Sequence, residues 1–346
     1  MKRLRVLTAL LLVLFLTSCL PALPGFAPTP SLTPLPVLSE VEGPPTETVI
    51  PLSTLTSTSE PTSTATEIPR PTSITRVLIV SIDGLRPDAI DMAPMPTLQG
   101  LMKVGAYSLS AQTIFPSSTL PSHASLLTGL CPSAHGVTWN SYLPENGFAK
   151  GTGLFNLAHA AGLRTVMIVG KEKLRQVTEP ASTDVFLWVN DLDPIIAKRA
   201  AQLIPDGFSL LFVHFPDPDL DGHNYGWMSY PQLFTLRRTD QALQTLLTAL
   251  DKADMRASTL IIVTADHGGH NTSHGFDIPL DMTIPWVIVG PGVQPKALTS
   301  PINTTDTAAT AAWALGLPLP PEWAGRPVLE AFGFPDDAPR PQPRCP

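Results

Sequence analysis

Five short apolar runs constrain the fold of this chain more than any other feature. The first, RVLIVSIDG over residues 76–84, is nearly continuous in apolar residues and ends at an Asp-Gly pair. Such runs are typical of strands buried on both faces of a parallel sheet, because a strand with one solvated face alternates apolar and polar residues. The other four runs are RTVMIVG (164–170), SLLFVHF (209–215), STLIIVTADHG (258–268) and IPWVIVG (284–290). Together they predict the buried strands of one domain.

Helical patterns lie between these runs. Residues 231–253 place on one face, at helical spacing, the leucines Leu233, Leu236, Leu243, Leu246, Leu247 and Leu250. GLFNLAHAAG, residues 153–162, indicates a second helix that ends at Gly162. Strands that alternate with helices predict an α/β fold, a doubly wound sandwich with a mainly parallel central sheet flanked by helices.

Acidic side chains follow several of the predicted strands directly. Asp83 follows the first run, Asp217 and Asp219 follow the third, and Asp266 and His267 follow the fourth. In open parallel sheets, ligands bind at the carboxyl ends of the strands. We therefore expect these three strands to deliver their carboxylates to one shared site.

The N-terminus has the pattern of a secretory signal, with a basic MKRLR followed by an apolar region of eleven residues, VLTALLLVLFL, in which Thr8 is the one polar residue. This run is too short to cross a bilayer. It ends in LTSC, which resembles a bacterial lipobox and makes Cys19 the expected lipidation site. We thus expect an extracytoplasmic lipoprotein held at the cell membrane by its lipid anchor. The alternative is an ordinary signal peptide with a chance cysteine.

The chain then divides into three further parts. Residues 20–75 contain 12 prolines and 19 serines or threonines, a composition that cannot bury a core, so we expect a disordered linker. The folded domain is expected over 76–335, and residues 336–346 are a tail. Cys131 and Cys345 are either a disulfide or two unpaired thiols. The net charge of −7 argues against nucleic-acid binding.

Carboxylates and histidines form a set with the character of metal ligands. The candidates are Asp83, Asp219, His223, Asp266, His267 and His274. Mixed Asp and His ligands suit Zn²⁺ best, with Mn²⁺ or Fe²⁺ as alternatives. Six ligands are too many for one tetrahedral ion with an open position, so we expect two ions. Paired ions are suited to in-line displacement at phosphorus.

The segment FPSSTLPSHASLLTG, residues 115–129, offers a nucleophile for such a displacement. It reads as a loop that leads into a helix, with Thr119 at or just before the helix N-terminus. Free N–H groups and the helix dipole favour an anion there. On this segment alone, an ordinary N-cap is the simpler interpretation. The metal-type cluster favours Thr119 as a nucleophile activated by metal coordination.

Five blocks in order now allow a comparison with a family: SIDGLRPD, FPSSTLPSHASLLTGLCPSAHGV, PDLDGHNYG, TADHGGH and SHGFD. They resemble the type I phosphodiesterase and nucleotide pyrophosphatase family of the alkaline phosphatase superfamily, across about residues 76 to 335. The resemblance implies an alkaline-phosphatase-like sandwich and two zinc ions. It implies one zinc held by Asp83, Thr119, Asp266 and His267, a second zinc held by Asp219, His223 and His274, and a phosphate contact from Asn140.

The resemblance also separates neighbouring candidates. The family's Asp-to-His spacing selects Asp219, so Asp217 and Asp221 are expected at the surface or in support of the ligands, and the pattern before Phe276 favours His274 over His270. One departure is Ser122, where well-known members often have asparagine. Because the chain also lacks the long insertions of the animal enzymes, their nucleotide specificity does not carry over.

Other polar residues receive ordinary interpretations. We expect hydrogen-bonded structural roles for His123, His135 and His214, and no partner for His159. Lys171 and Lys173 could meet a phosphate as point charges, but a solvated loop is the favoured interpretation.

The function predicted from these observations is a two-metal phosphoesterase that hydrolyses phosphodiesters or nucleotide pyrophosphates through a covalent phosphothreonine intermediate. The near alternatives are a phosphomonoesterase, for which Lys171 is the candidate cation, and a head-group phosphotransferase at the cell surface. A sulfatase is argued against because TLPSH lacks the Cys-x-Pro-Ser-Arg-like block. A surface lipoprotein that binds without catalysis is less favoured, because no candidate ligand or nucleophile is missing.

Overall fold

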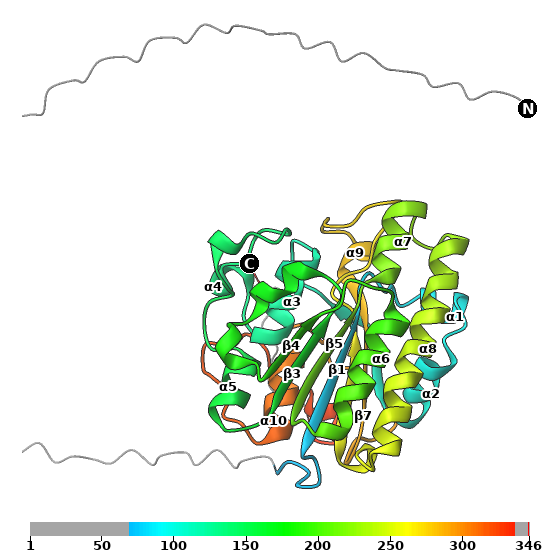
Figure 1. The fold of residues 1–346 in the computed structure, drawn as a ribbon. Coiled ribbons are helices and arrows are strands. Elements are labelled where there is room, and N and C mark those ends of the chain that lie inside the picture. Colours follow the sequence, from blue (N-terminus) through cyan, green and yellow to red (C-terminus); the bar gives the residue numbers. More distant parts are fainter. Residues whose placement is uncertain (1–68, 336–344, 346) are drawn as a thin grey trace, which may run out of the picture. The chain divides into compact units, whose positions relative to one another are not determined.

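The computed structural model describes residues 69–335 and Cys345, and Figure 1 shows their arrangement. In this part of the chain one sheet has eight strands in the order β4-β3-β5-β1-β6-β7-β2-β8. The strands are β1 Arg76–Ile82, β2 Ala106–Gln112, β3 Thr165–Val169, β4 Val185–Trp188, β5 Leu210–Phe215, β6 Thr259–Thr264, β7 Thr283–Val289 and β8 Lys296–Ala297. The predicted lipobox and nearly all of the predicted linker lie outside the described residues.

The centre of the sheet is parallel, as predicted. Strand β1 pairs in parallel with β5 on one side and with β6 on the other, and β3 continues the parallel order beyond β5. Strand β7 runs antiparallel to both β6 and β2, so the sheet is mixed at that edge. All five apolar runs are strands. Three further strands were not predicted, because β2, β4 and β8 are short or only partly buried and lack a continuous apolar run.

Helices cover both faces of this sheet (Figure 1). The helices are α1 Ala89–Met92, α2 Pro96–Val104, α3 Thr119–Thr128, α4 Pro132–His135, α5 Leu154–Ala160, α6 Asp193–Leu203, α7 Asp217–Tyr225, α8 Tyr230–Lys252, α9 Pro279–Met282 and α10 Asp306–Leu315. Helices α2, α6 and α7 pack around α8, whereas α3, α5 and α10 pack together. The two groups bury the sheet between them.

The two predicted helices are present. Helix α8 buries Leu236, Leu243, Leu246, Leu247 and Leu250 against the domain, while Leu233 is half-buried, so the predicted face is the inner one. Helix α5 is followed by Gly162, whose φ of 73° lies in the left-handed region that glycine adopts without steric cost.

Both ends of the described chain are tied to the domain. Ile74, just before the predicted start of the domain, is buried, and the Thr75 N–H donates to the Ser258 carbonyl at 3.1 Å. Near the other end, Cys345 forms a disulfide with Cys131, with a Cα–Cα distance of 5.1 Å. The alternative of two unpaired thiols is therefore wrong. None of the helices in the described part combines the length and the apolar character that a membrane span requires.

The disulfide closes a loop of 214 residues, so its removal should lower stability measurably. We expect Cys131→Ser to lower the free energy of unfolding by about 2–5 kcal/mol, because the unfolded chain regains the freedom that the cross-link removes. Denaturant unfolding with and without reductant measures this. The double variant Cys131→Ser/Cys345→Ser should match the single variant, and a wild type indifferent to reductant would contradict the prediction.

Candidate active site

Three adjacent strands deliver carboxylates to one edge of the sheet. Asp83 follows the last residue of β1, Asp266 lies two residues beyond the end of β6, and Asp219 lies in the first turn of α7, which follows β5. All three side chains are buried. The shared site expected from the strand ends is therefore present.

Two clusters of metal-type ligands form at this edge. One contains Asp83, Asp266 and His267, and the other contains Asp219, His223 and His274; within each cluster the ligand atoms lie within 4.8 Å of one another. Asp219 and His223 are four residues apart on α7, so they share one face of the helix. The clusters coincide with the two ligand sets that the sequence resemblance implies.

The carboxylates of these clusters are not satisfied by the protein alone. Asp83 Oδ1, Asp219 Oδ1 and Asp266 Oδ2 are buried oxygens without a hydrogen-bond partner among the described residues. Burial, together with the nearby charge of Asp83, raises the pKa of Asp266 well above its ordinary value. Buried carboxylates this close repel one another unless a cation lies between them. The donor set therefore fits divalent metal ions.

Backbone carbonyls prepare the three histidines as ligands. The Nδ1 atoms of His267, His223 and His274 lie 2.8, 2.9 and 2.8 Å from the carbonyl oxygens of Gly268, Thr272 and Ser117. Because a carbonyl only accepts, each Nδ1 donates, and each Nε2 keeps its lone pair free for a metal. Burial also lowers the pKa of His274 to about 3, so its ring is neutral.

Thr119 is the first residue of α3 and is fully buried. Its Oγ1 lies 3.5 Å from His267 Nε2, and therefore borders the first ligand cluster. Asn140 reaches the same helix end, where its Oδ1 accepts from the Leu120 N–H at 2.9 Å. The expected nucleophile and the expected phosphate donor thus meet at one helix N-terminus, which favours anions.

The favoured expectation for Lys171 and Lys173, a solvated loop, is wrong. Lys171 Nζ lies 2.7 Å from Asp83 Oδ2 and 2.5 Å from Asp219 Oδ2. Lys173 Nζ lies 2.9 Å from Asn140 Oδ1. A usable signal existed, because both lysines follow β3, and Val169 at its end pairs with His214 of β5. The rule that located the aspartates therefore also applied to these lysines.

This environment shifts the pKa values of the two lysines in opposite directions. Burial alone would lower the pKa of Lys171, but the carboxylates of Asp219, Asp83 and Asp266 outweigh it and raise that pKa above its ordinary value. The pKa of Lys173 falls to about 8, because burial and the nearby charge of Lys171 both disfavour its charged form.

The remaining histidines are hydrogen-bonded, as expected for three of them. His214 Nε2 donates to Asp83 Oδ2 at 2.8 Å, His123 Nδ1 donates to the Thr119 carbonyl at 2.7 Å, and His135 Nε2 donates to Ser125 Oγ at 2.9 Å. His214 therefore orients the candidate ligand Asp83, and His123 orients the first turn of α3, which carries Thr119. His159, expected to lack a partner, lies 3.5 Å from an oxygen of Asp184.

Other residues near the ligands have separate partners. His270 Nδ1 lies 2.7 Å from Asp281 Oδ1 and belongs to neither ligand cluster. Asp217 is buried, which corrects the expectation of a surface position. Its carboxylate accepts from the Asp193 N–H and pairs with Arg238, in support of the start of α6. Ser122, at the departure from the family pattern, accepts from Thr113 Oγ1 at 3.2 Å.

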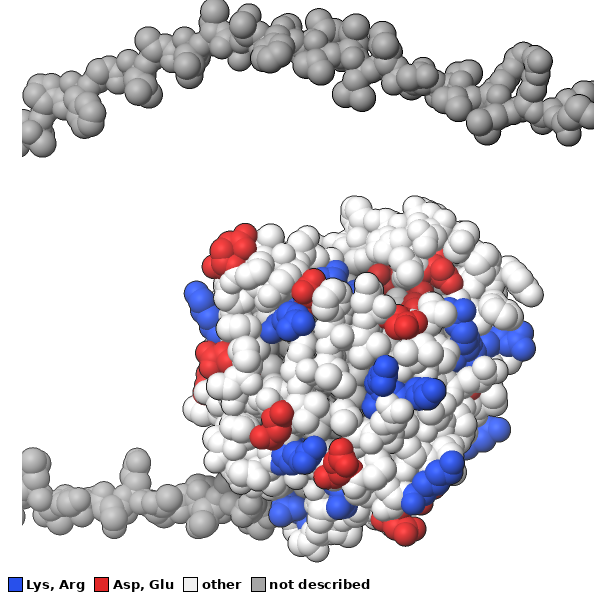
Figure 2. Space-filling model, in the orientation of Figure 1, with Lys and Arg blue, Asp and Glu red and all other residues white. Residues whose placement is uncertain are grey.

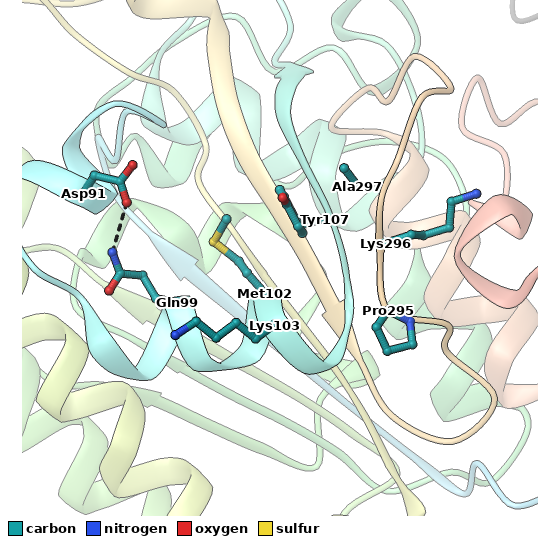
Figure 3. Close-up of a pocket in the computed structure, with 8 residues that line it drawn as sticks. All are labelled: Asp91, Gln99, Met102, Lys103, Tyr107, Pro295, Lys296 and Ala297. Carbon is teal, nitrogen blue, oxygen red and sulfur yellow. Dashed lines mark hydrogen bonds between the residues drawn. The ribbon is translucent and has the colours of Figure 1, made fainter.

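The surface near the candidate site carries little charge (Figure 2), and a separate cavity lies at another edge of the domain. Figure 2 shows mainly uncharged atoms at the top of this face, with a few Asp or Glu side chains below them. The carboxylates of Asp83, Asp219 and Asp266 are buried and contribute little to this surface. A cavity of about 520 Å³ lies elsewhere, between α2 and the β2–β8 edge (Figure 3). It is lined by Asp91, Gln99, Met102, Lys103, Tyr107, Pro295, Lys296 and Ala297, none of which is a predicted site residue.

Comparisons with known proteins agree with this geometry. A family model described as type I phosphodiesterase / nucleotide pyrophosphatase matches residues 77–156 and 165–283. The Xenopus laevis bis(5'-adenosyl)-triphosphatase enpp4 is 27% identical over 267 residues, which cover 70% of this chain and 57% of that protein. The human GPI ethanolamine phosphate transferase 2, catalytic subunit, is 28% identical over 294 residues, covering 76% of this chain and 29% of that protein.

A solved structure shows the same fold. Murine ectonucleotide pyrophosphatase / phosphodiesterase 5, as an inactive variant in complex with AMP, superposes with a TM-score of 0.63 at 17% identity, covering 74% of this chain and 98% of that one. The likeness extends over nearly the whole solved chain, whereas the sequence matches span little more than half of the frog protein or less than a third of the human one.

The two clusters predict a metal-binding stoichiometry. We expect metal-free protein to bind two equivalents of Zn²⁺ and to gain about 2.7 kcal/mol of stability per site at a hundredfold excess over Kd. Asp266→Asn should lose one equivalent while leaving the metal-free protein no less stable, because it removes a charge that its neighbours repel. Isothermal titration calorimetry and thermal unfolding measure both effects. Asp221→Asn, outside the clusters, is the matched control, and two equivalents retained in Asp266→Asn would contradict the assignment.

His135 predicts a pH dependence of stability. Burial lowers its pKa to about 4 in the folded protein, against about 6.5 in an unfolded chain. The unfolded state therefore binds more protons below pH 6.5, and stability falls as the pH drops from there toward the folded pKa. The loss at pH 4 is about 3 kcal/mol relative to pH 7.5. Urea unfolding of wild type and His135→Gln at pH 7.5 and pH 4 measures this effect. The variant should lose about 3 kcal/mol less unfolding free energy between the two pH values than wild type. Identical pH dependences of the two proteins would refute the assignment to His135.

Proposed function

The chain belongs to the type I phosphodiesterase / nucleotide pyrophosphatase family, and we propose that it is a metal-dependent phosphoester hydrolase in which Thr119 is the nucleophile. The observation that carries this proposal is the placement of Thr119. Its buried hydroxyl lies at the N-terminus of α3, beside a cluster of metal-type ligands and beside Lys171. A threonine that served only as an N-cap would not require this surrounding set of charges.

The reaction proceeds in two displacements. Thr119 Oγ1 forms a bond to phosphorus while the bond from phosphorus to the leaving oxygen breaks, and the hydroxyl proton ends on the leaving group. Water then attacks the phosphothreonine, restores the threonine hydroxyl and releases the phosphate product. Asn140, held by the Leu120 N–H, directs its amide N–H groups toward a non-bridging oxygen, where a donor strengthens as charge develops.

Two zinc ions are the cofactors that we propose. Asp83, Asp266 and His267, with Thr119 as a fourth ligand, would hold one, and Asp219, His223 and His274 would hold the other. When bound, paired ions lower the pKa of a coordinated hydroxyl and stabilise the charge of a phosphoryl transfer. Support comes from the unpartnered buried carboxylate oxygens and from the free Nε2 lone pairs of the three histidines. Histidine nitrogens in both sets favour zinc over magnesium or calcium, which prefer oxygen ligands alone.

Phosphodiesters and nucleotide pyrophosphates are the substrates that the names of the relatives indicate. Phosphomonoesters are the alternative that the structure of the site favours, because Lys171 lies beside Thr119. Transfer of a phosphorylated head group is a third reaction that this chemistry permits, since an alcohol can replace water in the second displacement. A relative with 28% identity bears the name of such a transferase.

We place the protein outside the cytoplasm, anchored to the membrane through Cys19. The basic and apolar N-terminal run and the LTSC sequence support this placement. The disulfide between Cys131 and Cys345 supports it as well, because disulfides persist mainly in oxidising compartments.

Replacement of the nucleophile tests the proposal. We expect Thr119→Ala, loaded with zinc, to lose about 10³-fold or more of kcat on bis-p-nitrophenyl phosphate, p-nitrophenyl phosphate and the nitrophenyl ester of thymidine monophosphate. Thr119→Ser should keep part of the activity and still form an acid-stable phosphoprotein from labelled substrate. Thr138→Ala, at an exposed position, is the control. Full turnover by metal-loaded Thr119→Ala would show that Thr119 is not the nucleophile.

A further inference from the structure

Two lysines of one loop enter the candidate active site from β3. Lys171 precedes the 3-10 helix η2, Glu172–Val177, and Lys173 lies in its first turn. Lys171 Nζ approaches Thr119 Oγ1 at 3.4 Å as well as the carboxylates of Asp83 and Asp219. Lys173 Nζ approaches the Oδ1 and the carbonyl of Asn140 at 2.9 and 3.2 Å. One ammonium group therefore borders the nucleophile, and the other borders the phosphate donor.

The two lysines differ in what they pair with. Lys171 contacts one carboxylate from each ligand cluster. Lys173 has no carboxylate within ion-pairing distance among the described residues, and its contacts are to neutral amide oxygens of Asn140. A half-buried ammonium group without a counter-ion is costly in a folded protein. An anion bound beside Asn140 would complete its environment.

Charge balance at the site points to the kind of anion. Two divalent ions would more than neutralise the three carboxylates of Asp83, Asp219 and Asp266, and Lys171 would then be released from most of its ion pairing. Both ammonium groups would remain as additional positive charge next to the phosphoryl position. The attraction grows with the charge on the phosphoryl group and is strong where water is largely excluded.

The arrangement of donors distinguishes two substrate classes. A phosphate monoester presents three terminal oxygens and two negative charges, which suit two ammonium groups and the Asn140 amide. A phosphodiester carries one charge on the reacting phosphorus and presents an uncharged ester oxygen with its carbon substituent in place of one terminal oxygen. A diester would therefore leave at least one of these donors without an anionic partner.

We propose that Lys171 and Lys173 form a dianion-binding pair that selects phosphate monoesters over phosphodiesters. This inference rests on the proposed phosphoester hydrolysis and names its substrate class. Lys171 contacts the substrate phosphoryl group directly. Lys173 contacts it as well and is also a positioning residue, because with the Leu120 N–H it holds Asn140 Oδ1 and leaves the amide N–H groups for the substrate.

The first test is a specificity ratio measured with the zinc-loaded full chain. We compare kcat/KM for p-nitrophenyl phosphate and bis-p-nitrophenyl phosphate at about pH 7, where the monoester is already mainly a dianion and Lys173, with its pKa of about 8, is still mainly charged. Wild type should prefer the monoester. Lys171→Gln and Lys173→Gln should each lower the monoester-to-diester ratio by about 10- to 100-fold, the effect of one lost charge-assisted hydrogen bond.

Matched variants separate specificity from other effects. Lys198→Gln, exposed on α6, should leave the ratio unchanged. Lys173→Arg should restore most of the ratio, because it keeps the charge. Zinc content is measured for every variant, so that a lost metal is not mistaken for lost recognition. If Lys171→Gln does not fold, Lys171→Met, which keeps the length of the side chain without its charge, replaces it.

Binding provides a test that does not require turnover. Calorimetry with inorganic phosphate and with dimethyl phosphate should show phosphate binding weakened at least about tenfold in the double lysine variant, with dimethyl phosphate binding much less affected. A wild type that prefers the diester, or variants that lose both activities equally with unchanged phosphate affinity, would overturn the dianion-binding pair. Loss of threonine dependence with phosphate binding still governed by the lysines would instead overturn the hydrolase proposal alone.

Discussion

The crowding of three buried carboxylates at one edge of the sheet is the constraint on which the rest of this structure depends. Asp83, Asp219 and Asp266 are brought together because β5, β1 and β6 are adjacent and parallel, so their carboxyl ends coincide. Such a concentration of negative charge is unfavourable in the interior of a protein. The neighbouring side chains and loops either offset this negative charge or contribute to a site that can bind cations.

The surrounding groups perform both tasks. Lys171 offsets the charge directly, and His214 donates to Asp83 and keeps its carboxylate in a fixed orientation. Carbonyl oxygens of two loops, Gly268 and Thr272 in one and Ser117 in the other, fix the histidine tautomers so that their Nε2 lone pairs are free for a metal. The N-terminus of α3 then places a threonine hydroxyl at the border of this charged cluster. The three carboxylates therefore have one structural origin, the parallel centre of the sheet, whereas Thr119 is placed by α3, which follows β2.

Much of this arrangement could be predicted, for identifiable reasons. Asp83 and Asp266 follow continuous apolar runs, and the rule for parallel sheets assigns both to the same edge. His223 and His274 were selected only through resemblance to a family, because a histidine four residues after an aspartate is common. Lys171 and Lys173 were considered as phosphate contacts but assigned to a solvated loop, although they follow a strand by the same rule, since a lysine in a polar loop usually points to solvent. For Asp217, the sequence left a surface position and a supporting role open, because burial of a carboxylate depends on partners such as Arg238 that lie on another helix.

The sequence by itself determined five of the eight strands, the buried face of α8 and the set of residues able to bind metal, because periodicity and strand-end position are local properties of the chain. Only the tertiary structure decided which side chains contact one another in the site. It placed Lys171 between two ligand clusters, set the Lys173 ammonium on the Asn140 amide and joined Cys131 to Cys345 across 214 residues. The physical reason is that such contacts depend on strand order and on the reach of individual side chains, and neither quantity is encoded in the local spacing of residues.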